Sequence, residues 1–426
     1  MKIIFKKNSF NKRGSFTVFA VFFFSSVVIC LIAAIASARS IFIGSSIESF
    51  GNLWAKNILS EYDLKLKERY GLLCYYGDTS SIEEKINSYS EFSLKDKEYI
   101  EYEPVVCDLT GYEMTITENL ADQIKMIVLQ GIKPANSIKR NTSEQIQTES
   151  QEEKSSRYIS SQWIINSLPS HEKTEDLYLL ELIKKIKAGI GVKELTREAA
   201  IDKYIFDFFK DYMNDRNVGD TFFNCEVEYI LSGELSDDRA KRTAGSKIKM
   251  VRNMLNLAYL YSCPEKRDSA LTLATSLAPT AAPLTQAAIL ELWAYLEAEN
   301  DLKILYDNKT VPLIKKDSNW ALTIENVSSS LMASDNSEES QNNDANGTEK
   351  KDYVSPASIE GQNYKEYLAV LLCGLSEETK LLRIMDLIQV NMKFTYFDYF
   401  LLKDYYCGLN YQMKVNGICH EFKDSY

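Results

Sequence analysis

Histidine is scarce in this chain of 426 residues, which has only His171 and His420. His171 lies in a polar stretch, and His420 lies near the C-terminus. A Ser-His-Asp triad would have to use one of them, and the sequence has no GxSxG motif to hold a nucleophile. It also lacks the HExxH, GxxxxGK[ST] and GxGxxG motifs of zinc, P-loop and dinucleotide sites. We therefore expect a protein that is not an enzyme, with no cofactor, no metal and no small-molecule substrate.

Closely spaced cysteine pairs are also missing. None of the eight cysteines forms a CxxC motif, which argues against a zinc or thiol redox site. Cys30 lies in an apolar run and the others follow it. One interpretation pairs Cys407 with Cys419 across a predicted terminal hairpin. The other treats these cysteines as free thiols that behave as small apolar side chains.

Basic charge is in deficit, with 49 Lys and Arg against 60 Asp and Glu and a net charge of −11. Nucleic-acid binding requires a basic surface, so we expect no nucleic acid partner. The 26 tyrosines are numerous. Tyrosine-rich surfaces suit contacts with proteins or glycans, but tyrosine is also an ordinary core and strand residue. The composition leaves both uses open.

The chain has one long apolar run. Residues 16–38 carry no charge and, as a helix, would extend about 34 Å, enough to cross a hydrocarbon core of about 30 Å. Lys2, Lys6, Lys7, Lys12 and Arg13 precede the run, and basic flanks stay in the cytoplasm. The sequence predicts a basic cytoplasmic leader (1–14) and a transmembrane helix (15–43). The protein would be a single-pass protein of the cell membrane, with its bulk extracellular.

Three interpretations of the N-terminus compete. The first is an uncleaved anchor. The second is a secretory signal cut after the small residues Ala36-Ser37-Ala38, although its apolar run is longer than usual. The third is a pilin-type leader, in which a peptidase cuts between Gly14 and Ser15 and leaves the apolar helix as the new N-terminus.

An amphipathic stem helix is predicted over residues 44–70, ending at Gly71, a typical C-cap residue. Apolar residues recur at every third or fourth position, which indicates one packing face of a helix. This stem packing face comprises Ile47, Phe50, Trp54, Ile58 and Tyr62. It would pack either on the protein's own outer domain or on neighbouring subunits.

The basic leader, Gly14 and the apolar helix resemble the N-terminus of TadE/TadG-like pseudopilins of tight-adherence (Flp-type) pilus systems. Later stretches resemble a larger uncharacterised family of membrane-anchored proteins from clostridia and related Gram-positive bacteria. Those stretches are 61–63, 68–73, 223–231, 256–261, 311–315 and 383–389. The resemblance implies a structural role at the cell surface, in contact with other pilus or secretion-system proteins.

One position departs from the pilin pattern. Polymerising pilins carry Glu at the fifth position after the cut, where it neutralises the amine of a neighbouring subunit. The matching residue here is Phe19. A minor pseudopilin, an accessory assembly factor or a plain anchored protein therefore fits better than a major pilin. The alternative from another class is an anchored binding module for cell-wall glycan or a protein partner.

The outer region is predicted to be α+β and helix-dominated, with helices packed on small antiparallel sheets. A proximal part (71–134) with a hairpin in 99–117 precedes a polar linker (135–160). A distal helix-rich domain (161–426) follows, with a disordered insertion at 327–360. Within the distal domain we expect strands at 222–231, 311–314 and 320–324, and a terminal hairpin that turns at Asn416-Gly417.

Two acidic pairs lie in the distal domain. Glu226 and Glu228 fall on one face of the expected strand at 222–231, where we expect exposure to solvent rather than a paired-carboxylate site. Ser236, Asp237 and Asp238 begin a helix, with the acids in its first turn. Helix capping accounts for this second pair without a bound cation.

Overall fold

The computed structural model describes residues 12–95, 100–134, 157–171, 182, 196–213, 221–333, 353–358 and 360–426. The chain forms two compact units. Unit 1 consists of Met1–Tyr62, Cys74–Tyr112 and Tyr406–Tyr426, and unit 2 consists of Asp63–Leu73 and Glu113–Tyr405. Helices dominate and the sheets are small and antiparallel, which confirms the predicted fold class.

Helix α1 (Lys12–Leu59) is a single helix of 48 residues. Its apolar section, residues 16–38, is exposed along almost its whole circumference. From Ile43 onward one face is buried, with Ile47, Trp54 and Ile58 following at helical spacing. The same helix therefore has an unpacked apolar half and a half that belongs to the core of unit 1.

The expected continuous stem helix 44–70 is divided in the structure. Helix α1 ends at Leu59, and a short helix, α2 (Leu64–Tyr70), follows in unit 2. The side chain of Asp63 caps α2 by accepting hydrogen bonds from the amides of Lys65 (2.8 Å) and Leu66 (3.0 Å). Gly71 ends α2 in the left-handed conformation at φ 73°, as expected for a C-cap.

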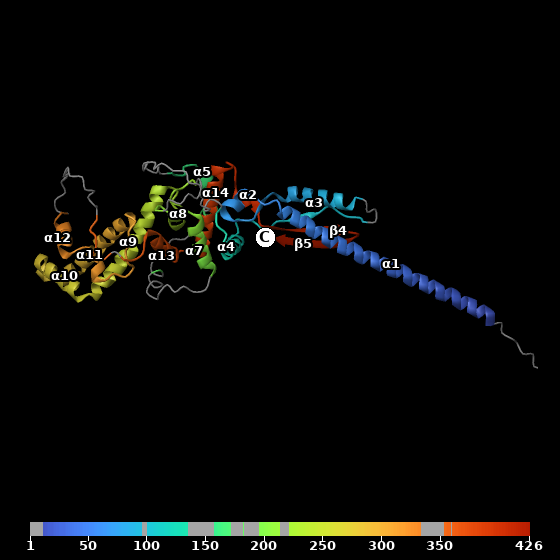
Figure 1. Cartoon of the computed structure of the whole chain (residues 1–426), viewed down its shortest axis with the longest axis horizontal. Helices are drawn as coiled ribbons and strands as arrows, with labels where there is room; N and C mark the ends of the chain where they lie inside the picture. Colours follow the sequence, from blue (N-terminus) through green and yellow to red (C-terminus); the bar gives the residue numbers. More distant parts are fainter. Residues whose placement is uncertain are drawn as a thin grey trace, which may run out of the picture. The chain divides into compact units, whose positions relative to one another are not determined.

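The C-terminal hairpin is the centre of unit 1. Strands β4 (Gly408–Val415) and β5 (Ile418–Ser425) pair in register from Gly408–Ser425 to Val415–Ile418. Asn416 and Gly417 join them with positive φ angles of 49° and 78°, as a type I′ turn requires. The predicted hairpin is confirmed. In Figure 1 the blue N-terminal part of α1 extends past β4 and β5.

The hairpin expected within residues 99–117 is wrong. Strand β2 (Val106–Asp108) pairs antiparallel with β4, so the sheet order is β2-β4-β5. Residues 112–116 form turns before α4 (Thr117–Gln130). Apolar and polar residues do alternate in this stretch, but the strand that pairs with β2 lies about 300 residues later in the sequence. A local pattern does not reveal such a pairing.

Unit 1 is completed by β1 (Tyr75–Tyr76) and α3 (Thr79–Leu94), whose first turn has a capping box between Asp78 and Ser81. Its core joins the buried face of α1 to α3 and the sheet. The buried members from the sheet are Cys107, Leu409, Tyr411, Met413, Val415 and Phe422. Strand β3 (Tyr405–Tyr406) lies at the sequence boundary between the two units.

Unit 2 is built mainly of helices. Besides α2 and α4, the described helices are α5 (Gln162–Asn166), α7 (Arg197–Phe208), α8 (Glu226–Ser232), α9 (Asp237–Ser262), α10 (Pro264–Leu277), α11 (Ala282–Tyr306), α12 (Ile324–Ala333), α13 (Tyr364–Leu372) and α14 (Glu377–Thr395). Three-residue 3₁₀ turns lie at Pro279–Ala281, Asp317–Asn319 and Leu402–Asp404. Helices α9 to α12 share a core that contains Leu260, Ala274, Trp293 and Val327.

The strands expected in unit 2 are wrong. Residues 222–231 contain α8, which begins at Glu226. Residues 311–314 contribute one isolated bridge between Val311 and Gln362, and residues 320–324 lead into α12. A short apolar run that is buried on every side shows neither the period of a helix nor the alternation of a strand. Its sequence therefore does not distinguish the two structures.

The domain boundaries also differ from the expectation. The C-terminal hairpin belongs to unit 1, so unit 1 is assembled from both ends of the chain. Residues 113–134, expected in the proximal part, belong to unit 2. Most of the expected linker 135–160, and residues 334–352 of the expected insertion 327–360, lie outside the described residues.

The glycines of α1 provide a test of the unit 1 core. A Cβ at Gly51 would overlap the buried ring of Phe422, whereas a Cβ at Gly44 has no neighbour within 4 Å. We expect Gly51→Ala to lower the free energy of unfolding by about 1–2 kcal/mol, because overpacking outweighs the gain in helix propensity. Gly44→Ala should be neutral or stabilising by up to about 1 kcal/mol. Denaturant unfolding of the purified protein measures both, and equal effects would contradict this packing.

Candidate functional site

The two residues of the predicted leader cleavage, Gly14 and Ser15, lie within the backbone of α1. Residues 1–11, which make up most of the predicted leader, lie outside the described residues. The scissile bond is therefore near the start of the helix. Its processing stays a prediction.

The predicted stem packing face lies in unit 1. Ile47, Trp54 and Ile58 are buried in the unit 1 core, and Phe50 packs against that core while stacking on Trp54 at 6.1 Å between ring centroids. The indole of Trp54 donates a hydrogen bond to Ser93 Oγ at 3.3 Å. Tyr62 is half-buried. This face is therefore occupied largely by the protein's own α3 and hairpin.

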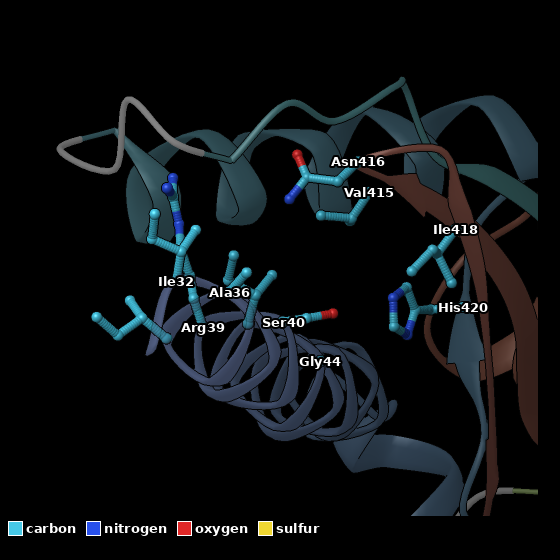
Figure 2. Close-up of a pocket in the computed structure, with 11 residues that line it drawn as sticks. Ile32, Ala36, Arg39, Ser40, Gly44, Val415, Asn416, Ile418 and His420 are labelled. Carbon is cyan, nitrogen blue, oxygen red and sulfur yellow. The ribbon is translucent and has the colours of Figure 1, made fainter. Parts of the chain in front are cut away.

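A groove opens where the buried face of α1 begins. It has a volume of about 410 Å³ and lies between α1 and the turn end of the β4–β5 hairpin. Helix α1 contributes Ile32, Ile35, Ala36, Arg39, Ser40, Ile43 and Gly44; the hairpin contributes Val415, Asn416, Ile418 and His420. Figure 2 shows the hairpin side chains facing the helix across an open space. We call it the helix–hairpin groove.

The helix–hairpin groove changes in polarity along α1. Ile32, Ile35 and Ala36 belong to the uncharged run, and Arg39 is the first charged residue after it. On the hairpin side, Asn416 and His420 add polar groups beside Ile418, which is 57% exposed. The sequence analysis did not identify this groove, because it depends on pairing residues 32–44 with residues 415–420.

Unit 2 contains buried carboxylates on α8. Glu226 and Glu228 are fully buried, so their expected exposure on a strand face is wrong. Glu226 accepts hydrogen bonds from the amide of Lys210 (2.9 Å) and from Asn391 Nδ2 (2.6 Å). Glu228 Oε1 accepts hydrogen bonds from the amide of Tyr212 and the hydroxyl of Tyr364. Both carboxylates thus hold the segment at 210–212 and α8 together.

These carboxylates titrate differently from exposed ones. Burial raises the pKa of Glu228 to about 7, although its hydrogen bonds oppose the shift. Glu228 Oε2 is buried without a hydrogen-bond partner among the described residues. Burial also raises the pKa of Asp386 on α14 to about 6, while Ser170 and Tyr229 donate hydrogen bonds to its oxygens. Near neutral pH these acids are close to their titration points.

Asp237, the first residue of α9, accepts hydrogen bonds from outside its own helix. Its Oδ1 accepts the amides of Asn224 (2.9 Å) and Cys225 (3.0 Å), and its Oδ2 accepts the amide of Arg157 at 3.2 Å. Ser236 is the N-cap residue of α9 but makes no side-chain capping hydrogen bond. Asp237 therefore organises the connections around α8 and α9, which explains its burial without a bound cation.

A fully buried ionic cluster links α9, α11 and the segment after α11. The Nε of Arg252 donates to Asp301 Oδ2 at 3.0 Å, and Lys315 Nζ contacts Asp301 Oδ1 at 2.6 Å and also pairs with Glu297. Glu297 additionally accepts the amides of Ala321 and Leu322. Two cations and two anions satisfy one another and the backbone, so this cluster is structural.

A second cavity, of about 320 Å³, lies on unit 2 beside an exposed aromatic segment. Trp163, Phe222, Phe394, Lys393 and Asp398 line it together with Ile159, Ile164 and Val390. Lys393 Nζ lies 4.3 Å from the centroid of the Trp163 ring. Within residues 394–400, Phe394, Tyr396, Phe397 and Tyr399 are exposed. The sequence Phe-Thr-Tyr-Phe-Asp-Tyr-Phe is the signal that the sequence analysis missed.

Cys407 and Cys419 form no disulfide with each other, so the interpretation that pairs them is wrong. The hairpin register places Lys414 opposite Cys419, and Cys407 precedes the ladder. Burial raises the pKa of the Cys107 thiol to about 12. Over the described ranges, no group of three or more His, Cys, Asp or Glu side chains is arranged to hold a metal ion.

Residues 119–417 match the model of a family described as "Family of unknown function (DUF5702)". The chain belongs to the DUF5702 family. The match begins in α4 and ends in the turn of the C-terminal hairpin, so it covers the helices of unit 2 from α4 onward and strand β4. Helix α1 lies outside the matched DUF5702 region. No curated protein and no solved structure matches the sequence.

The buried Glu228 predicts a pH dependence of stability. Between its ordinary pKa of 4.5 and about 7, the folded state keeps a proton that the unfolded state has released. The free energy of unfolding therefore falls as the pH rises through this window, by roughly 3 kcal/mol for this group. Glu228→Gln removes this titration and should reduce the slope of the profile between about pH 4.5 and pH 7, while the contribution of Asp386 stays.

Denaturant unfolding at several pH values measures this effect. Glu265, exposed on α10, provides the matched control, since Glu265→Gln should leave the profile unchanged. An unaltered slope in Glu228→Gln would contradict the assignment.

Proposed function

We propose that this protein is a single-pass, membrane-anchored structural protein of the cell surface. The observation that carries the proposal is α1, which is long and apolar enough to cross a membrane and is exposed over its apolar half. A signal sequence would pass the same test of length and composition. The apolar run, which is longer than that of a usual signal sequence, favours an anchor.

The charge distribution supports the orientation. Lys12 and Arg13 at the start of α1, with the lysines before them, form a basic flank that would stay in the cytoplasm. The helix would then deliver both units to the exterior. The acidic excess of the chain suits solubility there.

We further propose that the protein acts in, or beside, a tight-adherence (Flp-type) pilus or a related secretion machine, as a pseudopilin or accessory factor. The support is the resemblance of the leader and the apolar helix to TadE/TadG-like proteins. The buried ionic and carboxylate groups described above are bonded as structural groups. The mechanism would be structural, with α1 as anchor and the outer units making protein contacts.

Leader processing tests the pilin assignment. If a prepilin-type peptidase acts, the mature protein starts at Ser15, and Gly14→Ala leaves the precursor uncut. A simple anchor would keep Met1, and secretion after signal cleavage would leave Arg39 as the first residue. N-terminal sequencing and intact mass of protein from the native host distinguish the three results. An unchanged mature mass in Gly14→Ala would count against the pilin assignment.

The aromatic surface of unit 2 supports the alternative function, an anchored binding module for cell-wall glycan. Trp163 is 54% exposed and Tyr399 is 73% exposed, beside a cavity that also holds Lys393 and Asp398. Exposed aromatic rings bind the apolar faces of sugars, and clusters of them mark interaction sites.

Binding of the detergent-solubilised protein to purified peptidoglycan tests this alternative. We expect the double change Trp163→Ala and Phe397→Ala to weaken binding by about thirtyfold, since two stacking contacts of about 1 kcal/mol each are lost. Tyr261→Ala removes an equally exposed ring on α9 and should have no effect. No binding by the unaltered protein would exclude the glycan module.

A further inference from the structure

The cavity beside residues 394–400 of unit 2 combines an apolar wall with one buried cation. The wall is formed by Ile159, Ile164, Phe222, Val390 and Phe394. Lys393, which is only 7% exposed, lines the cavity from α14. The volume of about 320 Å³ lies in the range of small-molecule sites, which is about 300–1,000 Å³. We call this site the Lys393 cavity.

Contacts around the Lys393 cavity hold its aromatic rings in place. The rings of Phe222 and Phe394 meet edge to face, with 5.5 Å between their centroids. The guanidinium of Arg157 lies 5.3 Å from the centroid of the Phe394 ring and donates a hydrogen bond to the carbonyl oxygen of Phe222 at 3.0 Å. The amide of Phe222 donates a hydrogen bond to Asn391 Oδ1 at 2.8 Å. The apolar wall is therefore preformed, as in most ligand sites.

The ammonium of Lys393 has more hydrogen-bond donors than its neighbours use. Over the described part of the chain it donates one hydrogen bond, to the carbonyl oxygen of Asp398 at 3.4 Å, and it lies 4.3 Å from the centroid of the Trp163 ring. An ammonium has three N–H donors, so two remain for a ligand. Because a buried donor without an acceptor is destabilising, a ligand that supplies an acceptor in this cavity is favoured.

The charges around Lys393 favour a neutral acceptor over an anion. Burial lowers the pKa of Lys393, and the nearby carboxylates of Asp398 and Asp404 oppose this shift. Asp398 also lines the cavity, whereas Arg157 does not. An anionic ligand would meet these two carboxylates as well as the ammonium. An amide carbonyl oxygen accepts a hydrogen bond from the ammonium without that repulsion.

The acetamido group of an N-acetylated sugar meets these requirements together. Its carbonyl oxygen would accept a hydrogen bond from Lys393, and its methyl group would contact the apolar wall. A neighbouring hydroxyl would donate to Asp398, and the exposed ring of Trp163 offers a surface for the apolar face of the pyranose. We propose that the Lys393 cavity binds the acetamido group of an N-acetylhexosamine within a glycan chain. This inference rests on the alternative function proposed above, an anchored binding module for cell-wall glycan.

Two neutral trisaccharides test the proposal. The purified full-length protein is titrated with the β-1,4-linked trimer of N-acetylglucosamine and with the β-1,4-linked trimer of glucose, which has a hydroxyl in place of each acetamido group. We expect the N-acetylated trimer to bind about tenfold more tightly, since its carbonyl oxygen adds a hydrogen bond from a charged donor. Equal affinities would overturn the proposal.

Saturation-transfer NMR of the unaltered protein locates the bound group. Protons of the acetyl methyl should receive the largest share of the saturation, because the methyl group lies against the apolar wall. Methyl protons that receive none would overturn the proposal. Displacement of the N-acetylated trimer by acetate would overturn it as well, because Lys393 would then bind an anion.

A lysine variant with a matched control tests the role of the ammonium. Lys393→Met removes the donors but keeps a long apolar side chain, and it should weaken binding of the N-acetylated trimer about tenfold, to the level of the glucose trimer. Lys249 on α9 lies over the Tyr295 ring at 4.6 Å and does not line the cavity. Lys249→Met should therefore bind as the unaltered protein does. A Lys393→Met variant that keeps the preference for the N-acetylated trimer would contradict the assignment.

The Lys393 cavity and the glycan-binding module can fail separately. A protein that binds purified peptidoglycan but does not distinguish the two trimers would refute the acetamido site alone. A protein that binds neither peptidoglycan nor either trimer would refute both. A protein that binds the N-acetylated trimer through Lys393 but does not bind peptidoglycan would keep the site and refute the module.

Discussion

The core of unit 1 depends on the packing of the second half of α1 against the C-terminal hairpin. The hydroxyl of Tyr411 donates a hydrogen bond to the carbonyl oxygen of Gly51 at 2.6 Å. The hydroxyl of Tyr426 donates a hydrogen bond to the carbonyl oxygen of Leu59. Phe422 occupies the space that the missing side chain of Gly51 leaves. The first helix and the last strand of the chain therefore form one core. Because unit 2 lies between them in the sequence, unit 1 cannot close until β5 has been synthesised, whereas most of unit 2 is one continuous segment that can fold earlier.

Unit 2 contains buried charge in addition to its aromatic packing. A buried ion pair contributes little net stability, because desolvation offsets the attraction between its charges. Breaking one is costly, however, and this makes alternative arrangements of Arg252, Asp301 and Lys315 unfavourable. The carbonyl oxygens of Pro312 and Leu313 also accept hydrogen bonds from Arg252, at 2.9 and 2.7 Å. The cluster thus fixes an irregular segment that has almost no ladder hydrogen bonds of its own.

Features encoded locally were predictable, and features that depend on distant partners were not. The apolar half of α1 follows from an unbroken run of helix-compatible residues, whereas the end of the helix at Leu59 was not predicted. Asn416-Gly417 specifies its turn by positive φ angles. Around Glu226 and Glu228 the alternating pattern indicated a strand with a solvated face. Their oxygens instead accept hydrogen bonds from the backbone at 210 and 212 and from Tyr364, partners that a residue pattern does not contain. The helix–hairpin groove was hidden for the same reason.

The dual use of α1 limits how copies of this protein could assemble. The face that contains Ile47, Trp54 and Ile58 is occupied within unit 1, so it is not available to a neighbouring subunit as a pilin stem would require. Phe19 also offers no carboxylate to neutralise a neighbouring amine within the membrane. If α1 spans a membrane as proposed, contacts between copies through this helix would have to use its exposed apolar half, where only packing of small residues and lipid-facing side chains drives association. Such contacts are weak compared with a buried stem, and they favour a protein present singly or in low number beside a filament over one that forms the filament itself.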